Sequence, residues 1–165
     1  MIEKSQKSAL YRKYEAIHYA YHMDDSFFTL TQSNTELTTV MGGRPWSWHV
    51  VGITKAALIR YKELEFKHAS KSGITRAHLI PRIKTTTKLL NVDKPYSSKE
   101  FFDIWLSADK TVICGPGENK REFNVSWLPI DNVNYQLFNS KTIGWKFRVE
   151  ESIFLRSLYE KLLNN

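Results

Sequence analysis

The segment Gly73-Ile-Thr-Arg-Ala-His78-Leu-Ile-Pro81-Arg82 is the part of this sequence on which the fold prediction depends. Its first half is typical of a short β-strand that ends at a histidine, and an apolar pair follows. Pro81 then stops the strand, because proline has no backbone N–H to donate to a neighbouring strand. The sequence therefore predicts that His78 lies at the end of a strand.

A second segment, Asp109–Arg121, has the sequence Asp-Lys-Thr-Val-Ile-Cys-Gly-Pro-Gly-Glu-Asn-Lys-Arg. It contains a predicted strand at Thr111–Cys114, followed by a Gly-Pro-Gly turn. A polar helix is predicted to begin at Glu118-Asn119. We expect the strand end at His78 to face the helix start at Asn119, so that a metal ion and a water molecule fit between the two side chains.

Length and composition favour one globular domain. The chain has 165 residues, 42% of them hydrophobic and 25% charged, which is enough for a substantial core. We find no internal repeat and no clear linker, so we predict a single α+β domain over residues 1–165. No apolar run is long enough to span a bilayer, and the polar N-terminus lacks a signal sequence. We expect a cytoplasmic protein that does not bind a membrane.

Apolar spacing predicts four helices, at residues 3–22, 54–68, 101–106 and 150–163. Thr54 is the predicted N-cap of the second helix, and Ser97 to Glu100 forms a predicted capping box before the third. In the last helix the residues expected to face inward are Ile153, Phe154, Leu158 and Leu162. Strands are expected at residues 27–31 and 143–149, and a mixed loop is expected at residues 127–137.

The histidines of the first predicted helix and the single cysteine do not predict a metal site. His18 and His22 are four residues apart on a predicted helix, a spacing that can bind a metal. Because spacing fixes no third ligand, we interpret them as part of a helix surface and its end. Cys114 is the single cysteine, so neither an internal disulfide nor a multi-cysteine structural zinc site is expected.

Basic residues surround the predicted histidine strand. The chain carries a formal net charge of +7, which favours polyanionic partners, nucleic acid first and an anionic membrane second. Residues 55–94 contain ten Lys or Arg and three Asp or Glu, so this window alone accounts for an excess as large as that of the whole chain. We predict a phosphate-binding surface, and its best candidates are Arg76, Arg82, Lys84, Lys88, Lys120 and Arg121.

At these two segments the sequence resembles the HNH, or ββα-metal, nucleases. His78-Leu-Ile-Pro81 is similar to the family's first strand, which ends at the general-base histidine. Asp109 stands where the family's middle residue is expected, and Asn119 resembles the metal-binding residue at the helix start. The resemblance covers residues 73–124 and implies a ββα-metal nuclease core flanked by N- and C-terminal helices.

The resemblance also implies an activity. The chain resembles a compact type II restriction endonuclease that cuts double-stranded DNA at a short specific site, often as a homodimer. His78 would deprotonate a water molecule, and either Asp109 or a nearby backbone carbonyl would orient His78. Asn119 would bind a divalent cation, Mg²⁺ before Mn²⁺. The sequence departs from the family at Ala77, where a second metal ligand, often an aspartate, is common.

Two other functions fit the same residues. The first is a non-catalytic nucleic-acid-binding protein, whose base-stacking groups would be Trp46, Trp48 and Trp127. The second is a metal-independent ribonuclease that pairs His78 with His49 or His68. The ribonuclease needs no ligand at position 77, but it gives Asn119 no role.

Overall fold

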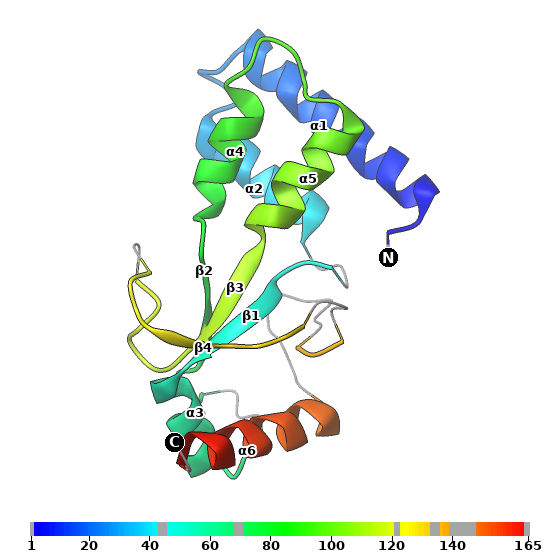
Figure 1. The fold of residues 1–165 in the computed structure, drawn as a ribbon. Helices are drawn as coiled ribbons and strands as arrows, with labels where there is room; N and C mark the ends of the chain where they lie inside the picture. The colour runs from blue at the N-terminus through cyan, green and yellow to red at the C-terminus, as the bar shows by residue number, and fades with distance from the viewer. Residues whose placement is uncertain are drawn as a thin grey trace.

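The structure is a computed structural model that describes residues 2–42, 46–67, 71–120, 123–132, 136–138 and 148–163. These residues form six helices and a four-stranded mixed sheet, so the predicted α+β class is confirmed. Figure 1 shows the sheet between two groups of helices, and the larger group lies on the side of the sheet where the chain's N-terminus is found. No helix among the described residues has the length and apolar character needed to cross a membrane.

The helices are α1 (Lys4–Met23), α2 (Leu30–Met41), α3 (Lys55–Glu63), α4 (Arg82–Leu90), α5 (Ser98–Ala108) and α6 (Val149–Leu163). The strands are β1 (His49–Thr54), β2 (Thr75–His78), β3 (Lys110–Cys114) and β4 (Trp127–Pro129). In the sheet the strand order is β2-β3-β1-β4, and only the β1–β3 pair is parallel. In this order β2 and β4 form the two edges of the sheet.

The two faces of the sheet pack differently. One face packs on α3 and α6 through a cluster that includes Ile53, Ile113 and Leu155, all fully buried. The opposite face carries a smaller cluster around Val112. Gly52 lies in line with Val112 in the β1–β3 register, and a Cβ atom at Gly52 would lie 2.1 Å from the ring of Trp127. This close contact requires glycine at position 52.

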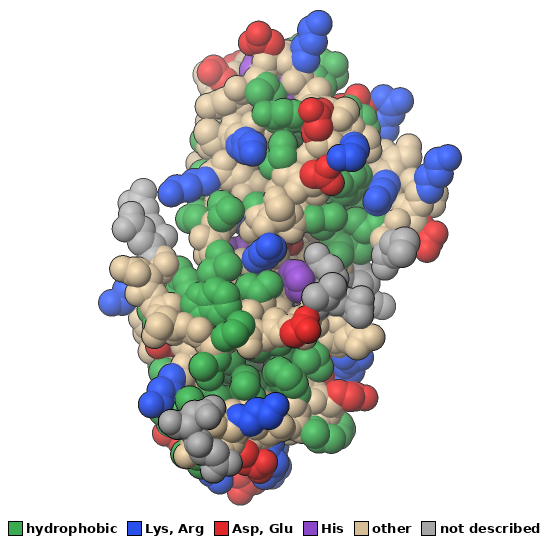
Figure 2. All heavy atoms as spheres, viewed as in Figure 1, with side chains coloured by type: hydrophobic (Ala, Val, Ile, Leu, Met, Phe, Trp, Pro, Cys, Tyr) green, Lys and Arg blue, Asp and Glu red, His purple; other side chains and the backbone are tan. Residues whose placement is uncertain are grey.

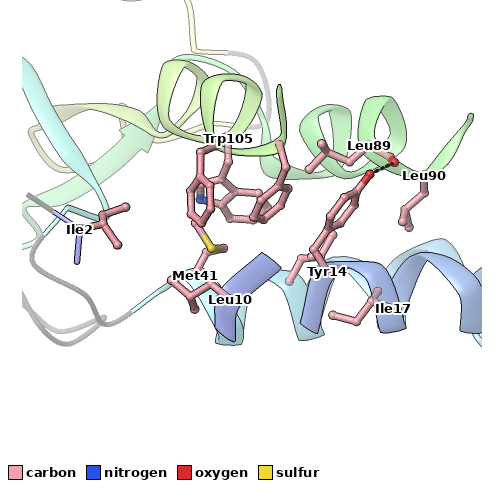
Figure 3. Close-up of a cluster of buried hydrophobic side chains, with 11 residues drawn as sticks. Ile2, Leu10, Tyr14, Ile17, Met41, Leu89, Leu90 and Trp105 are labelled. Carbon is pink, nitrogen blue, oxygen red and sulfur yellow. Dashed lines mark hydrogen bonds between the residues drawn. The ribbon is translucent and has the colours of Figure 1, made fainter. Parts of the chain in front are cut away.

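The larger helical group, α1, α2, α4 and α5, has its own core. The rings of Tyr14 and Phe101 stack at a centroid distance of 4.4 Å, and the Tyr14 hydroxyl donates to the carbonyl of Leu89 at 3.0 Å. Figure 3 shows this bond joining α1 to α4 inside the apolar cluster. Burial raises the pKa of Tyr14 to about 12, so the phenol remains a hydrogen-bond donor at neutral pH.

Local capping signals in the sequence are confirmed. The Thr54 side chain accepts a hydrogen bond from the Ala57 N–H at 3.1 Å and caps α3. Ser97 and Glu100 form the predicted capping box at the start of α5. These bonds satisfy backbone N–H groups that have no partner inside the helix. The predicted strands that contain His78 and Thr111–Cys114 also form, and they pair antiparallel as β2 and β3.

Several predicted elements differ from the structure in type or in extent. Residues 27–31 form no strand; instead Leu30 begins α2, because Thr29 and Gln32 make a capping box there. The expected loop at residues 127–137 includes β4, which pairs with β1. The predicted helix at residues 54–68 ends at Glu63 as α3.

In α6 one of the four residues predicted to face inward does not do so. Ile153 is 63% exposed, whereas Leu155 is fully buried. Phe154, Leu158 and Leu162 do pack against the α3–α6 core as predicted. The strand predicted at residues 143–149 lies outside the described residues up to position 147, and Val149 begins α6.

Candidate functional site

The candidate site lies where the larger helical group meets the sheet. His78 is the last residue of β2, and Asp109 is the C-cap of α5 immediately before β3. Arg82 is the first residue of α4, and Trp48 immediately precedes β1. Figure 1 shows β2 continuing into α4 and α5 continuing into β3 at this junction. The antiparallel pairing of β2 with β3 therefore brings His78 beside Asp109.

Three side chains make direct contact at this junction. The Nε2 atom of His78 lies 3.1 Å from Oδ1 of Asp109. Arg82 donates from Nε to His78 Nε2 at 3.0 Å and from Nη2 to Asp109 Oδ1 at 2.9 Å. Two adjacent N–H groups of one guanidinium therefore bind the imidazole and the carboxylate together.

This geometry selects the tautomer of His78. A guanidinium is always protonated and has no acceptor atom, so the Arg82 Nε–H can only donate. Nε2 of His78 must therefore carry the lone pair, and in the neutral imidazole the proton is on Nδ1. Asp109 and His78 are then two acceptors bound to the same guanidinium. In this arrangement Asp109 accepts no proton from His78.

Two tryptophan rings lie close to the cluster. The Arg82 guanidinium lies 4.6 Å from the ring of Trp48 and 5.7 Å from that of Trp105, within the range of cation–π attraction. The Trp48 and His78 rings are 4.6 Å apart. The side chains of His78 and Arg82 are 13% and 12% exposed, so solvent reaches the cluster only over a small area.

Asp109 carries the negative charge of the cluster. It is 3% exposed, and its Oδ2 accepts the backbone N–H of Trp48 at 2.9 Å. Burial alone would raise the pKa of Asp109, but the positive charge of Arg82 and the hydrogen bond from the Trp48 N–H lower it below its usual value. Asp109 is therefore ionised at neutral pH, and both of its oxygens are bound to neighbouring groups.

Arg76 lies inside the molecule, where the sequence predicted a phosphate contact. It is 8% exposed and donates to the carbonyls of Trp48 at 3.3 Å and Phe138 at 3.0 Å. Burial lowers its pKa to about 10, so the side chain remains charged at neutral pH. Its place on the α3–α6 side of the sheet, facing backbone carbonyls, does not suit a surface contact with DNA.

The helix predicted to begin at Glu118-Asn119 does not form in the described residues, which continue to Lys120. Gly117 has a φ of +78° in a turn, and Glu118 folds back over that turn. Its Oε2 atom accepts the Gly115 N–H at 2.7 Å and the hydroxyl of Thr54. Glu118 therefore joins the turn after β3 to the start of α3, and this bonded turn stands where the helix start was predicted.

Asn119 binds the edge of β2 and makes no contact with His78. Its side-chain N–H donates to the carbonyl of Arg76 at 3.2 Å. In an antiparallel pair, every second residue hydrogen-bonds to the neighbouring strand. Leu79 bonds to Lys110 of β3, so Arg76, three residues earlier, is at a non-bonded position and its carbonyl points away from β3. Within the described residues, no group of three or more His, Cys, Asp or Glu could hold a metal ion. One amide oxygen from Asn119 does not make a metal site, so these residues do not fit a Mg²⁺ ion held by the protein.

No family model, curated protein or solved structure matches the chain.

The remaining predicted phosphate contacts lie on the surface or outside the described residues. Lys84, Lys88 and Lys120 are exposed, and Arg121 is not among the residues that the structure describes. Figure 2 shows basic side chains spread over the visible face and interspersed with acidic ones, while hydrophobic side chains gather over the sheet. From residue 79 to 92 the sequence has no Asp or Glu, so α4 presents a locally basic surface next to His78.

The three other histidines among the described residues make hydrogen bonds to backbone carbonyls. His22 Nε2 bonds to the carbonyl of Leu90, the last residue of α4, at 2.7 Å, and His18 Nε2 bonds to the carbonyl of Val92 just beyond the helix at 2.9 Å. His18 is fully buried, contrary to the expected helix surface, and burial lowers its pKa. His49 Nε2 contacts the carbonyl of Asn132 at 2.7 Å, and burial lowers its pKa too. His68, the other expected ribonuclease partner, lies outside the described residues.

Arg82 has a role in the cluster that the sequence did not reveal. It was expected as a surface phosphate contact, and the structure places it between His78 and Asp109. A signal was present, since Arg82 follows His78 by four residues with Pro81 between them. A proline at that point ends the strand and starts a helix, which turns the arginine back toward the histidine. Trp48 and Trp105, which lie close to the guanidinium, gave no such signal.

Proposed function

We propose that this protein is an endonuclease that hydrolyses phosphodiester bonds in DNA and uses His78 as its general base. The supporting observation is the cluster of an imidazole, a carboxylate and a guanidinium at the end of β2. A strand that ends at a histidine and pairs antiparallel with a second strand is also the arrangement that the resemblance to HNH nucleases implies.

Each of the three side chains has a chemical role in this proposal. An imidazole takes a proton from water near neutral pH. A guanidinium binds a phosphate through two parallel hydrogen bonds and stabilises the charge that develops on it. The carboxylate of Asp109 fixes the position of both groups. A divalent cation remains an expectation from the resemblance, and no step is assigned to it because the described residues do not form a site for it.

The α4 surface supports a nucleic-acid partner. Lys84 and Lys88 are exposed and four residues apart on a helix that begins next to His78. Two residues with this spacing lie on one helix face, and the segment has no acidic side chain to oppose a phosphate backbone. Each phosphate contact that is removed is expected to reduce the salt dependence of binding by about 1 in log–log slope.

The finer proposal is a type II restriction endonuclease that cuts double-stranded DNA at a short site, as a homodimer. The purified protein would be incubated with plasmid and genomic DNA, in Mg²⁺ and in EDTA. Discrete bands would support site-specific cleavage, and a smear would indicate a nuclease without sequence preference. Cleavage that persists in EDTA would remove the metal from the proposal.

The role of His78 is tested by His78→Gln. We expect cleavage to fall by about two orders of magnitude or more, the usual effect of losing a general base. Salt-dependent DNA binding should survive. His22→Gln is the matched control, because His22 also bonds to its neighbours through Nε2 but lies at the far end of α4. If His78→Gln cuts DNA as fast as the wild type, His78 is not the base.

A second candidate is a non-catalytic DNA-binding protein. It is favoured by one observation, that Arg82 already occupies Nε2 of His78. Such a protein would bind DNA through the lysines of α4 and would cut neither DNA nor RNA with any ion. Tight, salt-dependent binding without cleavage in the same assay would select this function.

A further inference from the structure

We propose that Arg82 is a gate on His78, and that a phosphate group opens it by drawing the guanidinium away from the imidazole. The inference rests on the proposed function, since it assigns a regulatory contact to the same site. It concerns two states of one side chain. In the closed state, Arg82 binds Nε2 of His78 and Oδ1 of Asp109 at 3.0 and 2.9 Å.

The closed state holds His78 in a form that cannot act as a base. The Arg82 N–H occupies the lone pair of Nε2, and the proton of the neutral imidazole is on Nδ1. No nitrogen of the ring then has a free lone pair to take a proton from water. A catalytic His78 therefore requires that Arg82 first leave Nε2.

A phosphate is a better partner for the guanidinium than a neutral imidazole. A phosphate carries a negative charge that attracts the guanidinium, which a neutral imidazole lacks, and a guanidinium binds phosphate oxygens in pairs. Arg82 also has spare donor capacity, because none of the described residues accepts a hydrogen bond from its buried Nη1. The side chain is 12% exposed and its Nη1 is buried, so the guanidinium must turn outward to bind an anion at the surface.

Opening the gate leaves no buried acceptor of the cluster without a partner. His78 Nε2 lies 3.1 Å from Asp109 Oδ1, which is hydrogen-bond distance if Nε2 carries a proton. Once Arg82 has moved, Nδ1 releases its proton to water and Nε2 takes one from water, so the net charge is unchanged. The new Nε2–H donates to Asp109, and Nδ1 now has the free lone pair. Phosphate binding thus converts the imidazole into a base.

The tautomer can be measured directly by two-bond ¹H–¹⁵N correlation spectra of the ¹⁵N-labelled protein at neutral pH. We expect His78 to carry its proton on Nδ1 in the free protein. His18, His22 and His49 provide an internal reference, because each brings Nε2 to a carbonyl that can only accept, so each must be protonated there. The His78 signals are assigned by their loss in His78→Gln.

The gate is opened in two ways. Addition of inorganic phosphate, or of a nuclease-resistant phosphorothioate DNA duplex, should move the His78 proton to Nε2, and sodium chloride at equal ionic strength should not. Arg82→Met should show the Nε2–H form without any ligand, because methionine cannot donate. Lys84→Gln is the matched control, since it removes one positive charge from the exposed face of α4 and should keep the Nδ1–H form.

The proposal is overturned if the free protein already has His78 protonated on Nε2, or if neither anion changes the tautomer. Persistence of the Nδ1–H form in a folded Arg82→Met protein would also overturn it. If Arg82→Met does not fold, the wild-type titrations decide alone. None of these measurements needs turnover, so a lack of DNA cleavage would reject the nuclease function without affecting the test of the gate.

Discussion

Replacing Asp109 with alanine should destabilise the protein far more than the loss of an ordinary surface charge. Asp109 is 3% exposed and accepts hydrogen bonds from Arg82 and from the Trp48 N–H, both at 2.9 Å. The substitution leaves a largely buried guanidinium without its counter-charge and a backbone N–H without an acceptor. Removing one partner of a buried ion pair costs about 3–5 kcal/mol.

We expect the lower end of that range, about 3 kcal/mol, because the Arg82 side chain is 12% exposed and retains some hydration. With a urea m-value of about 2 kcal/mol/M, the unfolding midpoint should fall by about 1.5 M. Tryptophan fluorescence is a suitable probe, since Trp48 and Trp105 both lie within about 6 Å of the guanidinium.

The pH dependence gives a second test of the same reasoning. The pKa of Asp109 is lowered from its ordinary 3.8 in the folded state. A lowered carboxyl pKa contributes stability that is present above the unfolded-state value and is lost as the pH falls through the folded-state value. The difference between wild type and Asp109→Ala should therefore persist down to about pH 4 and shrink below it.

Asp103→Ala is the matched control. Asp103 also forms an ion pair, with Lys99 at 2.8 Å, but its side chain is 63% exposed, and pairs in water contribute little. The midpoint of this variant should barely change. If Asp109→Ala shifts the midpoint no more than Asp103→Ala does, the buried cluster does not hold the helices to the sheet as described.

Three further predictions concern other parts of the molecule. Burial lowers the pKa of His18 from 6.5, so the wild type should lose stability as the pH falls below that value. His18→Gln should reduce this dependence of stability on pH, measured by urea titrations at several pH values, and an unchanged dependence would contradict the prediction. Gly52→Ala should lower stability by about 1–3 kcal/mol, seen as a lower melting temperature, because its Cβ meets the Trp127 ring. Thr54→Val should cost about 1–2 kcal/mol in urea unfolding, since the hydroxyl caps α3 and bonds to Glu118; a neutral effect would exclude that role.

Local sequence signals were sufficient for much of the fold. The apolar stripe of α1 and the caps at Thr54 and Ser97 depend only on residues a few positions apart. Helix α2 was missed although Thr29 and Gln32 carry a capping box, because its threonine-rich sequence has low helix propensity. Packing against α1 and α4 stabilises α2, and the periodicity of a single sequence gives no information about such packing.

In the candidate site, too, contacts between neighbouring strands were predictable, and a contact with a residue distant in the sequence was not. Asp109 was expected beside His78, and the antiparallel pairing of their strands places it there. The helix at Glu118 was wrongly predicted because glutamate and asparagine favour helix starts and turns alike. Its partner, Thr54, is 64 residues away in the sequence, so spacing within the motif could not decide between the two.

The bond from Asn119 to Arg76 has a consequence for how copies of this protein can associate. It occupies an outward carbonyl of β2, a strand of four residues. At the other edge of the sheet, β4 has three residues and ends at Pro129, which has no N–H. Short strands with blocked or missing backbone groups resist the addition of a strand from another chain. If the protein forms the proposed homodimer, its subunits are therefore expected to meet through helices, and the sheet should be protected from edge-to-edge aggregation.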